Sequence, residues 1–335
     1  MGSAPQPGSR VHSRSTFVSS RVHGQPSGGK RRLRPFLKWA GGKRQLLPTF
    51  REFYPERFRA YHEPFLGSGA VFFDLAAEGR LGNGGVHLTD VNADLVGCWL
   101  RLRDDLDAVV ERLRALAADY EADPDDHYYR VRGRFNPARQ AIMNGTGPRA
   151  EQYTADLAAM FIYLNRTGYN GLFRLNSRGL FNVPRGRYKN PRICDEENLR
   201  RVSAVLSTLS VTVEPAGFDA VLRTARKGDF IYFDPPYAPL STTAYFTSYT
   251  SSGFDGEDQR RLQQVAVELA AKGCHVLLSN STAPEIADLY DGNPDAARAG
   301  LVAYTVAARR AINSKASRRG GVREYVVTNL PRRTA

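Results

Sequence analysis

The chain has 335 residues, of which 42% are hydrophobic, and it carries a net charge of +13. This length allows one large domain or two smaller ones, each with a buried core. The longest apolar runs have the length of strands, which excludes a membrane-spanning helix of about 20 residues. The first 34 residues contain no apolar stretch typical of a secretory signal. We therefore expect a globular, cytoplasmic protein.

The chain contains three cysteines, Cys98, Cys194 and Cys274. They are far apart in the sequence and lack the paired spacing of zinc ligands. We expect buried free thiols, with neither a disulfide framework nor a metal site.

The positive charge is concentrated in three stretches that contain no acidic residue. The first stretch, residues 1–34, has seven basic residues, and the others run from Arg166 to Arg192 and from Arg309 to Arg323. Three such clusters on one chain indicate a polyanionic partner, although each one alone also fits a solvated surface. Aromatic and turn residues within the second stretch favour a nucleic acid.

The predicted elements begin after a basic tail. Residues 1–33 combine low hydrophobicity with unbalanced charge, which predicts disorder. Strands are then predicted at Tyr61–Phe65, Val86–Thr89, Val211–Val213, Phe230–Phe233 and Val276–Leu278. Helical patterns alternate with them, which is typical of a doubly wound, mostly parallel α/β sheet. Near the end of the chain, Leu301–Val306 and Glu324–Leu330 are predicted to pair as strands.

The alternation is interrupted between Asp94 and Pro191, where helical patterns precede a stretch rich in Gly, Asn and Arg. We interpret residues 96–191 as an inserted, mainly helical domain. Residues 34–95 and 192–335 would then form the α/β domain.

The first motif is Glu63-Pro64-Phe65-Leu66-Gly67-Ser68-Gly69, which joins a predicted strand to a predicted helix at Ala70–Ala77. An α/β sheet binds nucleotide-like ligands at such a turn, and the glycines permit close backbone approach. The third glycine of the dinucleotide fingerprint is replaced by Phe72, which disfavours a pyrophosphate. Asp90 ends the next strand, where an acid commonly binds ribose hydroxyls. The alternative role for Asp90 is a helix N-cap. A ribose without a pyrophosphate fits S-adenosylmethionine.

The second motif, Asp234-Pro235-Pro236-Tyr237, directly follows the apolar run Phe230–Phe233. The acid would lie over the crevice where α/β folds bind ligands, and the prolines would hold a rigid turn with free carbonyls. A carboxylate and a carbonyl that accept both N–H groups of an exocyclic base amine would stabilise positive charge developing on its nitrogen. The tyrosine offers a flat face for a base. A purely structural double-proline turn is the alternative.

The third motif, Pro35–Lys43, precedes the first strand. Gly41 and Gly42 would let the backbone approach a ligand, while Trp39 and Lys43 offer a flat apolar wall and a partner for a carboxylate. Alone, this segment is ambiguous, because Trp39 would also fit the core and Lys43 the surface.

Together, the three motifs resemble the DNA adenine-N6 methyltransferases of the Dam type (D12 class, alpha group, GATC-methylating members). The resemblance runs from about Arg34 to Leu330, with further matching segments at Tyr163–Leu172, Phe181–Lys189 and Ala238–Ser241. It implies a Rossmann-like methyltransferase sheet that carries an inserted target-recognition domain. It also implies an enzyme that uses S-adenosylmethionine and double-stranded DNA.

The resemblance assigns roles residue by residue. Catalysis falls to Asp234, Pro235, Pro236 and Tyr237, and Asp234 and Tyr237 would also hold the flipped adenine. Contacts to S-adenosylmethionine fall to Trp39, Ala40, Gly41, Lys43, Glu63, Pro64, Phe65, Gly67, Gly69, Asp90 and Asp234. Contacts to DNA fall to Tyr169, Asn170, Leu172, Arg174, Pro184, Arg187 and Tyr188.

The resemblance also implies the target sequence GATC. Arg174 would donate two hydrogen bonds to a guanine, and Leu172 would pack on a thymine methyl. Tyr169 and Asn170 would fill the space that the flipped base leaves. A phosphate contact is the alternative for Arg174.

Two other functions remain open on the residues alone. Methylation of cytosine N4 or of RNA would use the same amine chemistry, and a DNA-binding protein without catalysis would keep the basic clusters. The expected location is the cytoplasm, in association with the nucleoid, and a cognate restriction endonuclease is an expected genetic partner.

Overall fold

The computed structural model describes residues 1–2, 33–39, 41–82, 84–208, 210–239, 253–309 and 321–333. Ala40 and nearly all of the predicted tail at residues 1–33 lie outside the described residues. Leu33–Ala335 is one compact unit.

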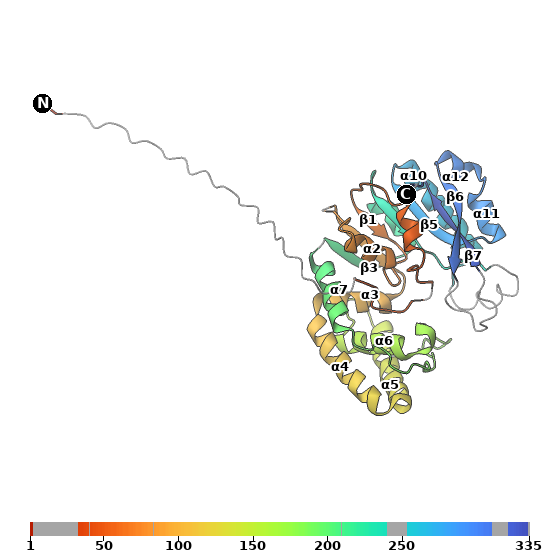
Figure 1. Ribbon diagram of the computed structural model, residues 1–335. Coiled ribbons are helices and arrows are strands. Elements are labelled where there is room, and N and C mark those ends of the chain that lie inside the picture. Colours follow the sequence, from red (N-terminus) through yellow and green to blue (C-terminus); the bar gives the residue numbers. More distant parts are fainter. Residues whose placement is uncertain are drawn as a thin grey trace. The chain divides into compact units, whose positions relative to one another are not determined.

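The centre of the fold is a seven-stranded sheet in the order β3-β2-β1-β4-β5-β7-β6 (Figure 1). Its strands are β1 (Tyr61–Glu63), β2 (Val86–Asp90), β3 (Val211–Pro215), β4 (Phe230–Phe233), β5 (His275–Ser281), β6 (Val302–Arg309) and β7 (Gly321–Thr328). Strands β1 to β5 run parallel, while β7 is antiparallel to both of its neighbours. The predicted mostly parallel α/β sheet is confirmed, as is the pairing of the two C-terminal strands.

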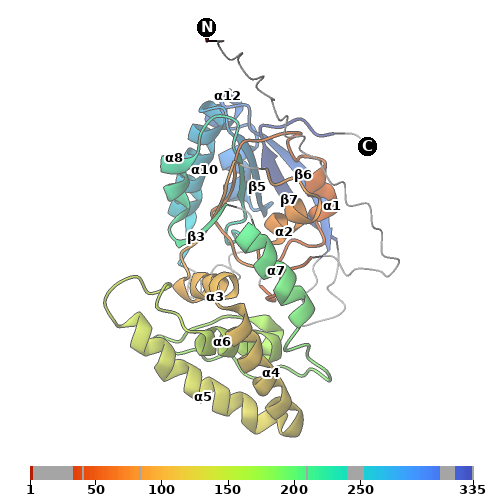
Figure 2. The same cartoon turned by 90° about the vertical axis from the view of Figure 1, so that its left-hand side faces the viewer.

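Helices cover both faces of this sheet. The α-helices of the described residues are α1 (Leu47–Arg51), α2 (Ala70–Ala77), α3 (Ala93–Asp104), α4 (Leu106–Ala122), α5 (Pro124–Met143), α6 (Ala155–Thr167), α7 (Glu196–Thr208), α8 (Val221–Thr224), α10 (Gly256–Ala271), α11 (Pro284–Tyr290) and α12 (Pro294–Arg298). Figure 2 shows α8 and α10 on one side of the sheet and α1 and α2 on the other. Within the described ranges, no helix is both long and apolar enough to cross a membrane.

The central strand β4 explains why both faces are covered. Phe230 and Tyr232 belong to the hydrophobic core on the α1 and α2 side, where the rings of Phe50 and Tyr232 lie 5.6 Å apart. Ile231 and Phe233 belong to the second core, which packs against α10. A continuous apolar run is what a parallel strand buried on both faces requires.

The segment between β2 and β3 is mainly helical, as predicted. Almost every residue of α6 is buried, because this helix packs against α3, α4 and α5. Arg139 of α5 donates to both carboxylate oxygens of Asp94 in α3, at 2.9 and 2.8 Å, and both side chains are buried. The predicted boundary at residue 96 falls inside α3, and the division into domains stays a prediction.

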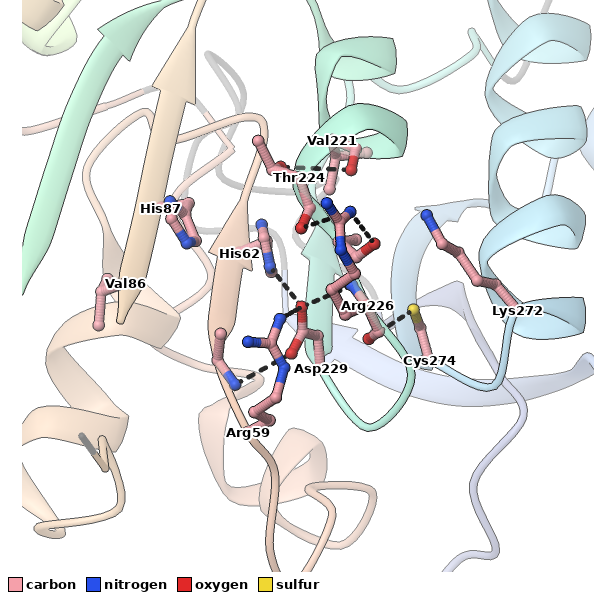
Figure 3. A network of polar contacts seen from close by, with 12 residues as sticks. Arg59, His62, Val86, His87, Val221, Thr224, Arg226, Asp229, Lys272 and Cys274 are labelled. Carbon is pink, nitrogen blue, oxygen red and sulfur yellow. Dashed lines mark hydrogen bonds and ion pairs between the residues drawn. The ribbon is translucent and has the colours of Figure 1, made fainter. Parts of the chain in front are cut away.

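A second polar cluster joins β1 to β4 (Figure 3). The fully buried Asp229 accepts hydrogen bonds from Arg59 at 2.8 Å, His62 at 3.0 Å and the backbone N–H groups of Ala60 at 3.1 Å and Arg226 at 2.8 Å. Burial acts to raise the pKa of Asp229, but the hydrogen bonds from His62, Arg226 and Arg59 hold it below its ordinary value. Asp229 directly precedes β4, so its carboxylate stabilises the amino-terminal end of the central strands. Ligands of α/β folds bind at the opposite, carboxyl end.

Candidate active site

A cavity of about 1010 Å³ opens at the carboxyl ends of β1, β2 and β4. All three sequence motifs contribute to its walls, as the shared direction of parallel strands predicts. The predicted residues that line it are Trp39, Gly41, Lys43, Glu63, Phe65, Gly67, Asp90, Asp234, Pro235, Pro236 and Tyr237. The structure therefore brings together residues that are up to about 200 positions apart in the sequence.

The turn after β1 is built around Gly67, whose φ is 46°. A Cβ atom at this position would lie 2.9 Å from the Trp39 ring, so only glycine lets the indole form that wall. The Gly67 N–H donates to Asp90 at 3.0 Å. Asp90 also accepts from the Asn92 N–H at 2.9 Å, while Asn92 caps α3. The N-cap alternative for Asp90 is therefore wrong, because the neighbouring asparagine fills that position.

Two predicted residues of the first motif do not line the cavity. Pro64 is absent from its walls, and so is Gly69, the N-cap residue of α2, whose φ is 64°. A Cβ atom on Gly69 would lie 2.6 Å from the Trp99 ring. A glycine is therefore required at position 69 so that the Trp99 ring can pack behind the cavity.

Glu63, at the end of β1, is a buried acid in the cavity wall. It accepts hydrogen bonds from the Tyr61 hydroxyl at 2.8 Å and the Phe72 N–H at 3.1 Å. Burial raises the pKa of Glu63 to about 8, although these two hydrogen bonds act against the rise, and nearby Asp234 adds to it. At neutral pH this carboxyl keeps its proton, which makes it a potential hydrogen-bond donor.

Asp234 follows β4 and is held from two sides. Lys43 forms an ion pair with its Oδ1 at 2.7 Å, and the Ser279 hydroxyl of β5 donates to the same oxygen at 3.0 Å. Lys43 also donates to the Gly41 carbonyl at 2.6 Å. Burial raises the pKa of Asp234, whereas Lys43 and Ser279 act to lower it. The carboxylate is therefore oriented before any ligand arrives.

The turn after Asp234 is anchored to the neighbouring elements. Gln259 of α10 donates to the Pro236 carbonyl at 3.0 Å. The Tyr237 hydroxyl donates to Glu324 of β7 at 2.7 Å, and the Lys43 ammonium lies 4.3 Å from the centre of the Tyr237 ring. The tyrosine thus has a defined orientation beside Asp234.

The seven residues predicted to contact DNA lie in a separate segment, residues 168–192. Two isolated antiparallel bridges, Gly168 with Arg185 and Leu175 with Phe181, fold this segment back on itself. Tyr169 begins the short 3₁₀ helix η1 (Tyr169–Gly171) and is 47% exposed.

The backbone brings the two halves of this segment together. Asn170 has a φ of 54°, the one positive value among the described non-glycine residues. The Tyr169 N–H donates to the Pro184 carbonyl at 2.9 Å. Arg174 is exposed, and its Nε donates to Asn182 at 2.8 Å. Leu172 and Tyr188 are half-buried, whereas Pro184 and Arg187 are exposed.

A profile of the D12 class N6 adenine-specific DNA methyltransferases matches residues 39–311 of this chain. The chain belongs to that family. It is thus an adenine-specific DNA methyltransferase, and the predicted resemblance to the Dam type is confirmed.

Individual methyltransferases match almost the whole chain. The type II methyltransferase M1.LlaDCHI of Lactococcus lactis subsp. cremoris is 38% identical over 298 residues, which cover 89% of this chain and 95% of that protein. The type II methyltransferase M.MjaIII of Methanocaldococcus jannaschii is 37% identical, with 89% and 99% covered. The DNA adenine methylase of Escherichia coli is 34% identical, with 89% and 96% covered.

The structure adds residues to the methyltransferase cavity that the sequence motifs missed. Phe218 and Asp219, in η2 (Phe218–Ala220) after β3, line it together with Phe254. The rings of Phe65 and Phe218 stack with their centres 5.5 Å apart and an angle of 19°, and Phe254 meets Phe65 edge-on at 5.7 Å. An aromatic and an acid within six residues of the end of the predicted strand Val211–Val213 are the signal that could have found Phe218 and Asp219.

Direct contacts connect the cavity with the segment that is predicted to bind DNA. Trp39 lines the cavity and stacks with Phe173 at 6.3 Å and 19°. The buried Asn165 accepts from the Lys38 N–H at 2.8 Å and donates to the carbonyls of Lys38 at 2.6 Å and Gly171 at 2.9 Å. One amide therefore fixes the spacing between the segment beside Trp39 and the turn at Gly171.

Proposed function

We propose that this enzyme transfers a methyl group from S-adenosylmethionine to N6 of a flipped adenine in double-stranded DNA, within the sequence GATC. The main support is Asp234, which lies beside Tyr237 in a cavity shared with Asp90 and Glu63 and is held by Lys43 and Ser279.

The cavity fits S-adenosylmethionine by the chemistry of its walls. Asp90 would accept from ribose hydroxyls, and the stacked Phe65 and Phe218 would hold the adenine of the cofactor. Trp39 would cover an apolar side, and the protonated Glu63 would donate a hydrogen bond. The bound cofactor supplies a methyl group on a positively charged sulfur.

The residues at the other end of the cavity would prepare the adenine. Asp234 and the Pro235 carbonyl would accept the two N–H groups of the exocyclic amine and stabilise the charge that develops on its nitrogen. Tyr237 would stack on the base, which must leave the helix to reach the cavity. Lys43, paired with Asp234, acts against the rise in the pKa of this carboxyl that burial causes, and it holds the carboxylate in place.

Asp234→Ala tests this chemistry. The substitution should lower the rate of methyl transfer by more than about hundredfold, while the fold and most of the DNA affinity remain. Labelled methyl transfer, together with DNA binding, measures both. Asp295→Ala, at an exposed acid of α12, is the control and should keep the wild-type rate. An Asp234→Ala rate within about tenfold of wild type would contradict the mechanism.

The target sequence depends on Arg174. If its guanidinium reads guanine, Arg174→Ala should lose about 1–3 kcal/mol of discrimination between GATC and a duplex altered at that guanine. If it binds phosphate, all duplexes should weaken alike. Arg178→Ala, at an exposed position of the same segment, is the matched control. Equal transfer by the wild type to GATC and to altered duplexes would refute the target.

Two relatives are named type II methyltransferases. A cognate restriction endonuclease is therefore the genetic partner that we propose, and the genes next to this one test it. The insertion at residues 96–191 would carry target recognition, with residues 169–188 at the DNA surface.

A further inference from the structure

The Tyr237 hydroxyl is bound by a carboxylate from near the end of the chain. It donates to Glu324 at 2.7 Å, and both side chains line the cavity. Glu324 lies on β7, opposite Ser281 of β5 and Val306 of β6. Because β7 is hydrogen-bonded to β5 and to β6, its backbone is held in place, and so is the carboxylate that it carries towards Tyr237.

The other contacts of Tyr237 set its place relative to Asp234. The Lys43 ammonium lies 4.3 Å from the ring centre and 2.7 Å from the Asp234 carboxylate. Burial, and next the charges of Asp234 and Glu324, raise the pKa of the Tyr237 phenol well above its ordinary value. The phenol therefore stays a neutral donor near pH 7, and Glu324 keeps its hydrogen bond.

We propose that Glu324 is a positioning residue for methyl transfer, which acts by fixing the ring of Tyr237 through its hydroxyl. This rests on the proposed function, in which the target adenine stacks on that ring. Without this hydrogen bond the ring keeps its contact with Lys43, but its hydroxyl loses the carboxylate that holds it, so the tilt of the ring beside Asp234 is less well defined. The adenine amine would then lie less often in line for transfer, which lowers the rate more than the binding.

Positioning of Tyr237 by a hydrogen bond can be distinguished from an effect of the negative charge of Glu324 on methyl transfer. Glu324→Gln keeps an oxygen acceptor on a side chain of the same length, whereas Glu324→Ala removes it. Positioning therefore predicts that the glutamine variant recovers most of the rate. A role of the charge predicts that the glutamine and alanine variants are equally slow.

A double-mutant cycle tests the proposal in the full-length enzyme with a GATC duplex. Glu324→Ala and Tyr237→Phe should each lower the single-turnover rate by roughly ten- to hundredfold, and the double variant should be no slower than the slower single variant. Glu324→Gln should stay within about threefold of wild type. The dissociation constant of S-adenosylmethionine should change by less than about twofold in every variant.

A spectroscopic readout follows the ring itself. The fluorescence of 2-aminopurine at the target position is quenched by stacking, so the flipped base should be brighter with Glu324→Ala than with wild type. A purely structural role of Glu324 would not produce this change at unchanged cofactor affinity.

Three results would overturn the proposal: a wild-type rate in Tyr237→Phe, losses that multiply in the double variant, or a glutamine variant as slow as alanine. Should Glu324→Ala fail to fold, Tyr237→Phe alone decides, because it keeps the ring and leaves the half-buried Glu324 to water. A wild-type enzyme that methylates no DNA would refute the proposed function instead.

Discussion

Replacing Glu63 with Gln should remove a pH dependence of folding that the wild type carries. The side chain is fully buried at the end of β1, and burial raises the pKa of Glu63 to about 8, against hydrogen bonds from Tyr61 and Phe72. The ordinary pKa of a glutamate, 4.5, applies to the unfolded chain. Glutamine resembles the protonated carboxyl in size and polarity but does not titrate.

The sign and size follow from the two pKa values. Below about pH 4.5, the folded and unfolded states both hold the proton. Between about pH 4.5 and 8 only the folded state holds it, so the free energy of unfolding falls as the pH rises, by up to about 1.4 kcal/mol per pH unit. Above about pH 8 both states are ionised and the loss is complete. From about pH 6 to 8, Glu63 should cost the wild type roughly 2 kcal/mol.

Urea unfolding of the ligand-free protein at about pH 6, 7 and 8 measures this effect. The free energy of unfolding of Glu63→Gln, relative to wild type, should rise by roughly 2 kcal/mol across that range, because other titrating groups contribute equally to both proteins. Glu111→Gln, at an exposed position of α4, is the control and should follow the wild type. Parallel curves for Glu63→Gln and wild type would refute a protonated Glu63.

Three further predictions concern packing, the buried ion pair and the tail. Gly69→Ala should destabilise the protein by about 3 kcal/mol or more in urea unfolding, because its Cβ atom would lie 2.6 Å from a buried indole. Gly79→Ala, at the same φ of 64° with open space around it, should cost only about 1 kcal/mol. Arg139→Ala should cost about 3–5 kcal/mol by leaving Asp94 buried without its cation, and the loss should shrink when Asp94 is also replaced by Ala. Deleting residues 1–33 should reduce the salt dependence of DNA binding without changing the preferred site.

The sequence was informative about the cavity because its main acids end apolar strands. In a parallel sheet the carboxyl ends of the strands lie on the same side, so Asp90 at the end of β2 and Asp234 after β4, with β1 between these strands, line one cavity. The helix predicted at Ala70–Ala77 has the same bounds as α2. Gly69, directly before it, marks the start of the helix by adopting a left-handed conformation at the N-cap.

Other features depend on which distant segments pack together, and a single sequence does not reveal that. Glu324 reaches Tyr237 because β7 runs antiparallel to β5, which places the start of β7, with Glu324 opposite Ser281, beside the carboxyl end of β5. Phe254 joins Phe65 and Phe218 across the cavity by side-chain packing alone. Asn92, and not Asp90, is the N-cap of α3. Both residue types are common N-caps, so the sequence alone does not tell which of the two caps the helix.

If the insertion carries target recognition, as proposed, the Asn165 amide, which binds Lys38 on one side and Gly171 on the other, restricts how that specificity can be redesigned. A chimaera that exchanges only the helical insertion between two such enzymes would keep one partner of this junction and replace the other. In the same way, such a chimaera would keep Trp39 and replace Phe173, on which it stacks. Exchange of specificity is therefore expected to succeed only when the segment around Lys38 and Trp39 is transplanted together with the insertion.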